Sequence, residues 1–478
     1  MRRLALRGVA LSLLCHFGHA FYQPFYHLAP LYSGSPSPVK WKKHKRLKRQ
    51  RPFPLSQETE SEVGDTSEEP NSISITAILN AALLISGTTV GGGFLALPTV
   101  VAPSGFTPSA TALVGVWAFF LVESFVVVEC IQNTRDFSSR RKGNDGSETL
   151  PGIAAAAKSA FGTVGETIIV LLLVLLTEAT LVSQISRAGA LFSKYRWGCA
   201  TVALSVASIV FGPRQGTKLS AYVNSALTIV FVIMAANLFS TGAPAADWSG
   251  LTATNSWASL PGAIPTFLQL LVYGEILPTV CQLLKYRVKP IRLAIILGSI
   301  LPLGLEIGWA ALGMGLVPPS STMGDPVDLL LAAGPVQRPL LVLAVTAILT
   351  TIIGSYLALQ STFDDVFPAD KAPRKAPFRR LTAATSIVIP ALAIASISPD
   401  LFLRAIDFAG SYPVVLLWGV APPTIVMMQR RNGNLNKEQQ SIPQWALLML
   451  TVLSLGLFST SAIFDLMFLA GKFKSLLL

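Results

Sequence analysis

Glycines and threonines gather in one short stretch of an otherwise apolar segment. Residues 78–98 read ILNAALLISGTTVGGGFLALP, with SGTTVGGG in the middle. Glycine weakens a helix interior by about 1 kcal/mol relative to alanine, and threonine hydroxyls compete for the backbone groups of a helix. Backbone N–H and C=O groups released by a break can bind a small polar ligand, and they need a partner wherever water is absent. The candidate binding residues here are Ser86, Gly87, Thr88, Thr89, Gly91, Gly92 and Gly93.

Close packing of small residues against a neighbouring helix is the alternative explanation for this stretch. Residues 87–93 contain four glycines and two threonines, which is more than such packing needs. Irregular backbone at membrane depth usually lines a binding site. We therefore favour a helix break that binds a ligand.

A second apolar segment, residues 260–284, is interrupted in a similar way. Tyr273, Gly274 and Glu275, followed by Pro278, place a helix weakener, a charge and a helix breaker inside it. A charge near the middle of a membrane costs at least ~2.5 kcal/mol on insertion scales and usually faces a cavity. Tyr273, Gly274 and Glu275 are therefore candidate binding residues. A proline kink beside a protonated, hydrogen-bonded Glu275 is the alternative.

Two more polar residues within apolar segments are candidates for the same site. Glu178 lies in LLLVLLTEATLVSQ, and Ser355 lies in TTIIGSYLALQ. For Glu178, pairing with another helix of a bundle explains the sequence equally well. Glu178 and Glu275 are also the candidates for carrying a coupled proton, because carboxyls within membrane spans mark proton relays. Glu123 is a candidate of lower weight, and the sequence assigns no role to Glu306 and Asp407.

The segments that carry these residues have the composition of a multi-pass membrane protein. Of 478 residues, 51% are hydrophobic and 13% are charged, against about 25% charged in a soluble domain. The mean hydropathy is +0.56. The net charge of +12 is spread over short loops, which favours membrane topology over nucleic-acid binding. The four cysteines show neither disulfide nor metal-ligand spacing, so we expect no metal and no cofactor.

The hydropathy pattern predicts eleven membrane spans, each needing about 20 residues. We place them at 73–100, 109–130, 163–184, 197–212, 218–240, 260–284, 290–314, 338–362, 380–398, 404–428 and 443–468. With the N-terminal tail on the cytoplasm-like side, the loops on that side hold nineteen lysines and arginines, and the opposite loops hold five. This asymmetry supports the orientation and the odd number of spans.

The two predicted breaks fall in the first and the sixth of these spans. Broken helices at corresponding positions of two five-span halves are the best sequence indication of a transporter's midplane binding site. Two breaks at corresponding positions would arise by chance much less often than either break alone. We therefore expect residues 73–470 to form one transporter domain whose site lies between the breaks.

The first seventy residues lie outside this domain. Residues 1–20 have a basic start, an apolar run and Gly18-His19-Ala20 as a cleavage site, which predicts a signal peptide. Phe21 and the basic stretch KWKKHKRLKRQR follow, and residues 21–72 are expected to be disordered. This order resembles the bipartite presequences of algae with secondary plastids and implies a plastid envelope. An ordinary signal for the plasma membrane or an endomembrane is the alternative.

The sequence around both breaks resembles one family, the hydroxy/aromatic amino acid permeases that carry tyrosine and tryptophan. The resemblance covers roughly residues 73–465. It rests on GTTVGGG at 87–93 with LALP at 95–98 and GF at 105–106, on PTV at 278–280, on IRLAIILG at 291–298 with ILPL at 300–303, and on FDDVF at 363–367.

The resemblance implies an all-α polytopic fold, with five plus five helices in an inverted repeat like that of the leucine transporter and an eleventh helix added. It also implies amino acid uptake coupled to protons by alternating access. The half-helix after Gly93 would present N–H groups to the substrate carboxylate, and carbonyls freed at the breaks would receive the ammonium. The expected partners are an amino acid, a proton and the lipid bilayer.

One departure from the family stands in the sixth span. Relatives commonly carry Phe-His before a small or amide residue, where this chain has Tyr273-Gly274-Glu275. Our hypothesis is that Glu275 carries the coupling proton or meets the substrate ammonium.

Two other classes of membrane protein fit this sequence less well than a transporter does. All four histidines lie within the first 44 residues, and the chain has no P-loop, which argues against an embedded enzyme and a nucleotide-driven pump. A non-transporting amino acid sensor or a channel on the same fold remains the alternative.

Overall fold

The computed structural model describes residues 73–142, 152–212, 216–252, 255–316, 330, 336–366, 376–432 and 442–477. The predicted signal peptide and the basic and acidic tail lie outside the described residues.

Every regular element of the described part is helical. The elements, in chain order, are α2 (Ile75–Thr89), η3 (Gly92–Ala96), α3 (Leu97–Val101), α4 (Phe106–Lys142), α5 (Ile153–Ala190), α6 (Tyr195–Val210), α7 (Gly216–Gly242), η4 (Ala243–Ala245), η5 (Trp248–Thr252), η6 (Trp257–Gly262), α8 (Ile264–Leu271), η7 (Gly274–Ile276), α9 (Leu277–Leu283), α10 (Val288–Leu316), α12 (Gln337–Val366), α13 (Ala376–Ala395), α14 (Leu401–Ala409), η9 (Gly410–Val420), α15 (Ala421–Arg431) and α16 (Gln444–Leu477).

These helices form the membrane bundle that the composition predicts. Within the described residues, eight helices are long and apolar enough to cross a membrane, and a ninth span is the bent pair Ile75–Thr89 and Gly92–Val101. Two shorter apolar helices, Tyr195–Val210 and Leu381–Ala395, lie where the fourth and ninth spans were expected. The all-α polytopic fold is confirmed, together with helix breaks in the first and sixth predicted spans. The count of eleven spans remains a prediction.

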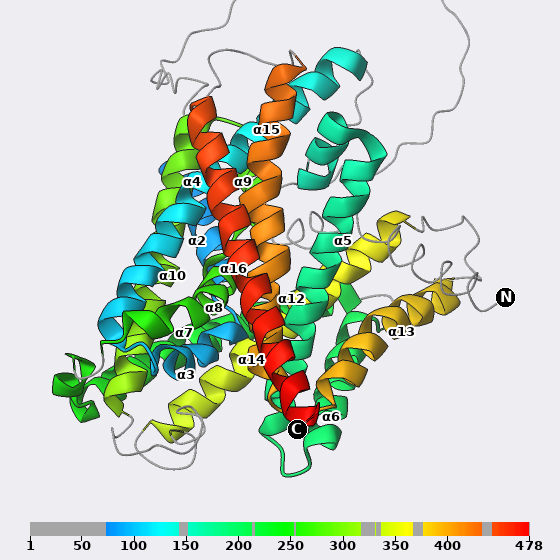
Figure 1. Ribbon diagram of the computed structural model, residues 1–478. Coiled ribbons are helices and arrows are strands. Elements are labelled where there is room, and N and C mark those ends of the chain that lie inside the picture. The colour runs from blue at the N-terminus through cyan, green and yellow to red at the C-terminus, as the bar shows by residue number, and fades with distance from the viewer. Residues whose placement is uncertain are drawn as a thin grey trace, which may run out of the picture.

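The outer surface of the bundle is apolar, as a lipid-facing surface must be. α16 runs along the outside of the bundle beside α15 (Figure 1) and packs against η9. Only 17% of its apolar window is buried. Large exposed side chains on this helix are Trp445, Leu448, Met449, Val452, Leu453, Leu455, Ile463, Phe464, Leu466 and Met467. Apolar exposure on this scale is typical of a surface that faces lipid or a partner protein.

The first break is held against α10 by close backbone contact. A Cβ atom on Gly298 of α10 would lie 2.6 Å from the carbonyl oxygen of Ala82 in α2, so only glycine permits this approach. The Ser86 hydroxyl donates to the Gly298 carbonyl at 2.7 Å. Ser86 therefore fixes the end of α2 to its neighbour, just before the chain leaves the helix.

Candidate functional site

The first break begins at the end of α2. The Thr88 hydroxyl donates to the carbonyls of Leu84 and Ile85 at 3.1 and 2.9 Å, and the Thr89 hydroxyl donates to that of Ile85 at 2.8 Å. Gly91 is extended, with φ −128° and ψ −174°, and the chain then resumes as η3 and α3. The two halves meet at an angle of 48°. The glycine-rich stretch thus breaks the helix, as its sequence predicts.

The glycines of this break also permit close contact with three other helices. A Cβ atom on Gly92 would lie 1.9 Å from Gln184 Oε1 of α5, and one on Gly93 would lie 2.7 Å from Leu270 Cδ2 of α8. The N–H of Gly92 donates to Thr351 Oγ1 of α12 at 2.9 Å. The break and the packing of small residues, which we treated as alternatives, therefore occur together.

The second break begins where α8 ends at Leu271. Val272 is extended, with ψ 133°, and Tyr273 has φ −143° and ψ 13°, so neither residue continues the helix. The short turn η7 carries Gly274 and Glu275 and leads into α9. A Cβ atom on Gly274 would lie 2.3 Å from Trp418 Cε3 of η9, which makes glycine necessary at this position.

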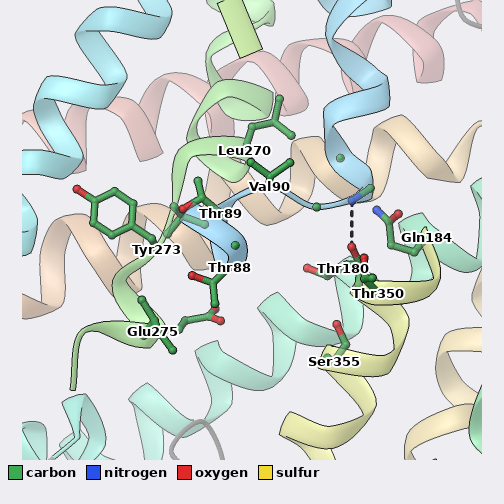
Figure 2. A pocket seen from close by; sticks show the side chains of 18 of the residues that line it. Thr88, Thr89, Val90, Thr180, Gln184, Leu270, Tyr273, Glu275, Thr350 and Ser355 are labelled. Atoms are coloured by element: carbon green, nitrogen blue, oxygen red, sulfur yellow. Dashed lines mark hydrogen bonds between the residues drawn. The ribbon is translucent and has the colours of Figure 1, made fainter. Parts of the chain in front are cut away.

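Both breaks border one cavity of about 840 Å³, which Figure 2 shows from close by. This volume is within the range for small-molecule sites, ~300–1,000 Å³. Most of the residues that the sequence singles out line it: Ser86, Gly87, Thr88, Thr89, Gly91, Gly92, Gly93, Tyr273, Glu275 and Ser355. Gly274 does not line this cavity but a smaller one behind the second break. Glu178 of α5 does not line it either.

Ten further polar residues of the cavity wall are not among the site residues that the sequence analysis names. They are Thr177, Thr180, Ser183 and Gln184 of α5, Asn224 and Thr228 of α7, Gln269 of α8, and Thr350, Thr351 and Gln360 of α12. The spacing of Thr177, Thr180 and Gln184 is i, i+3, i+7, which puts them on one face of a helix. This polar stripe is the sequence signal that could have identified the face of α5 that lines the cavity, which does not include the predicted Glu178.

The cavity combines hydrogen-bonding groups with an apolar wall. Its carboxyl group is that of Glu275, and its other polar groups are hydroxyls, amides and backbone. In the described structure, the amide oxygens of Gln184, Gln269 and Gln360 are buried without a hydrogen-bond partner. Phe231, Leu270, Leu301 and Leu305 supply apolar surface. Such a site suits a small ligand with a polar end and an apolar side chain.

Metal binding has no support in the described part of the chain, where no group of three His, Cys, Asp or Glu side chains could hold an ion.

Comparison with known protein families identifies the family of the chain. The family model described as the tryptophan/tyrosine permease family matches residues 74–462, which include both breaks. The chain belongs to the tryptophan/tyrosine permease family. The resemblance expected from the sequence motifs is thereby confirmed, and the protein is a multi-pass membrane protein of a permease family.

Two relatives of this permease are proteins of Haemophilus influenzae. "Tyrosine-specific transport system 1" is 24% identical over 403 residues, which cover 80% of this chain and 95% of the relative. "Tyrosine-specific transport system 2" is 25% identical over 354 residues, covering 69% and 82%. Among solved structures, a manganese transporter of Eremococcus coleocola is 14% identical, with a TM-score of 0.49 over 83% of this chain and 95% of that one.

Proposed function

We propose that this permease is a secondary transporter that carries an aromatic amino acid, tyrosine or tryptophan, together with a proton by alternating access. The observation that supports this most directly is the cavity of about 840 Å³ bordered by both helix breaks. The names of the two Haemophilus relatives support tyrosine as the first substrate to test.

The substrate's charged end would lie at the breaks. Gly91, Gly92 and Gly93 have no side chains to cover their backbone, so a carboxylate can approach it from the cavity. The N–H of Gly92 is already bonded to Thr351, whose hydroxyl in turn donates to Ala347, which leaves the neighbouring backbone groups for the substrate. The ammonium would meet Glu275 or the carbonyls of the second break.

The aromatic ring would lie against the apolar part of the wall. Phe231 of α7 and Leu301 of α10 line the cavity, and Leu270 of α8 packs beside Gly93. Burying an aromatic side chain of 150–250 Å² against such residues supplies much of the binding energy. The unpaired amide oxygens of Gln184 and Gln269 could accept a hydrogen bond from a phenol or an indole N–H.

A proton can be carried by the carboxyls that the sequence singled out. Glu275 lines the cavity itself. One carboxylate oxygen of Glu178 is buried in the described structure without a hydrogen-bond partner. Neither residue needs a metal to act, because a carboxyl in a nonpolar site can take up and release a proton as its surroundings change.

Uptake by purified protein in vesicles tests the proposal. The full chain is reconstituted, and labelled amino acids are offered with an inward proton gradient, an inward sodium gradient or neither. We expect tyrosine or tryptophan to accumulate above its external concentration only with the proton gradient. Accumulation of neither under any gradient would contradict transport of aromatic amino acids. Saturable binding without accumulation identifies a sensor, and equilibration without accumulation identifies a channel.

We also propose that residues 1–70 direct the protein to a plastid envelope. The support is the order of a signal-like segment, Phe21 and a basic stretch without acidic residues. A fluorescent fusion of residues 1–70, expressed in an alga with a secondary plastid, should collect at the plastid. Fluorescence at the plasma membrane or an endomembrane would contradict the proposal, and Phe21→Ala should divert the fusion.

A further inference from the structure

A second, much smaller cavity lies behind the second helix break. Its volume is about 10 Å³, roughly the space that one water molecule requires. It is lined by Glu123 and Ser124 of α4, by Tyr273 and Gly274 of the break, and by Trp418 of η9. Three separate elements therefore meet around a site that could hold one water molecule.

Several polar groups at this small cavity are unsatisfied in the described structure, whereas the Ser124 hydroxyl donates to the Phe120 carbonyl at 2.6 Å. Glu123 is 1% exposed, and within the described structure neither of its carboxylate oxygens has a hydrogen-bond partner. The indole Nε1 of Trp418 is also buried without one. A carboxylate in such a place costs far more free energy than an apolar residue of similar size would. Packing therefore does not explain why a glutamate occupies position 123.

No fixed cation neutralises Glu123 among the residues that the structure describes. Two cations contact other residues of α4, since Arg430 pairs with Glu129 at 2.6 Å and Arg292 lies over the Phe125 ring. The other titratable group that lines the small cavity in the described structure is the Tyr273 hydroxyl. It is not a cation, so a proton is the simplest charge that can neutralise this carboxyl.

The small cavity and the large cavity share a wall residue. Tyr273 lines both, and Figure 2 shows its ring extending away from Thr88 and Thr89, which face the large cavity. Gly274 touches the Trp418 ring so closely that no side chain would fit between them. Trp418 lies in η9, which is a π-helix. π-Helices are rare and often occur at functional sites. A rearrangement of the second break must therefore alter the surroundings of Glu123.

We propose that Glu123 binds and releases one proton in each transport cycle, and that Tyr273 links this proton site to the large cavity. In the small cavity, which has room for no more than about one water molecule, the carboxyl is neutral. When the break moves and admits further water, the O–H proton of the carboxyl passes to that water. The carboxylate left behind is then stabilised by water and by the N–H of Trp418. The inference rests on the proposed transport function and adds a proton site outside the substrate cavity.

The number of coupled protons tests this inference. In vesicles held at zero membrane potential with potassium and valinomycin, the steady-state accumulation of labelled tyrosine, or of whichever amino acid the wild type accumulates, is measured against the pH difference. Each coupled proton contributes about a tenfold accumulation ratio per pH unit, so the logarithmic slope counts protons. We expect the slope to fall by one in Glu123→Gln. An unchanged slope in a correctly assembled variant, or a wild-type slope of zero, overturns the inference.

The matched control is Glu306→Gln. Glu306 of α10 is another buried glutamate, 1% exposed, with an unpartnered carboxylate oxygen in the described structure, but it borders neither cavity. Its replacement should leave the slope unchanged. A slope that falls equally in both variants overturns the inference, because loss of any buried carboxyl would then have the same effect. Failure of the wild type to accumulate any amino acid would instead contradict the proposed function, before any variant is compared.

Glu123→Asp provides a second measurement in case the glutamine variant does not assemble. It keeps an ionisable group and shortens it by one methylene. In infrared difference spectra between acid and alkaline buffer, the carboxylic acid band should shift in Glu123→Asp relative to the wild type. An identical band in both proteins overturns the inference, since Glu123 would then not titrate.

Discussion

The N–H of Gly92 donates a hydrogen bond of 2.9 Å to the hydroxyl of Thr351, 259 positions further along the chain. The same hydroxyl donates to the Ala347 carbonyl at 2.8 Å, within α12. Thr351 therefore ties the first helix break to α12 and satisfies a backbone group that would otherwise be buried alone. Because both residues line the large cavity, this bond also fixes the shape of the proposed substrate site.

Thr351→Val should weaken both the fold and substrate binding. Valine keeps the volume but leaves the buried N–H of Gly92 without a partner, at a cost of about 1–3 kcal/mol. We expect a lower thermal midpoint in detergent and a higher KM for uptake. Thr351→Ser keeps the hydroxyl and should retain most of both properties. Equal behaviour of the valine and serine variants would show that the hydrogen bond contributes little.

Gly92→Ala should distort the first break. The added Cβ atom would lie 1.9 Å from Gln184 Oε1 and 3.3 Å from the Ile348 backbone, so the amide of Gln184 has to move. Overpacking of this kind typically costs about 1–3 kcal/mol, and we expect uptake to be largely lost. The control is Gly304→Ala in α10, where a Cβ atom would meet nothing within 4 Å. Thermal unfolding and uptake of both variants check the prediction.

The ion pair between Glu129 and Arg430 should be important for stability. Arg430 donates to Glu129 Oε1 at 2.6 and 2.9 Å and to the Ile442 carbonyl at 2.8 Å, joining α4, α15 and the segment just before α16. Removing one partner of a buried pair costs about 3–5 kcal/mol because the other charge is left unpaired.

Glu129→Gln and Arg430→Met should therefore each lower the thermal midpoint strongly. The thermal midpoint of the double variant should fall by less than the sum of the two single-variant falls, because the double variant leaves no lone charge. A fall equal to that sum, measured by unfolding in detergent, would contradict a direct interaction between the two side chains.

Glu275→Gln should alter the response of uptake to pH. If Glu275 takes up the coupled proton, the wild type transports faster as the pH on the loading side falls, and the glutamine variant loses that rise. If Glu275 instead meets the substrate ammonium, KM increases at every pH. Initial rates across a pH series separate the two roles. Unchanged KM and unchanged pH dependence would exclude both.

The sequence by itself determined the membrane fold and both helix breaks. The length of the apolar segments and the glycines of residues 87–93 can be read locally, because each residue affects helix stability only within a turn or two of its own position. Their common cavity was also predictable, since a freed backbone group in a membrane must find a partner. The sequence motifs around the breaks predicted the permease family that the family comparison assigns.

Only the tertiary structure decided which other residues share the site. Thr351 and Gln184 reach the first break from α12 and α5, and Glu129 pairs with Arg430, which is 301 positions away. The small cavity at Glu123 likewise depends on how α4, η9 and the second break pack. The physical reason is that a polar stripe on a helix shows which residues share a face, but the neighbour that this face meets is set by packing between helices far apart in sequence.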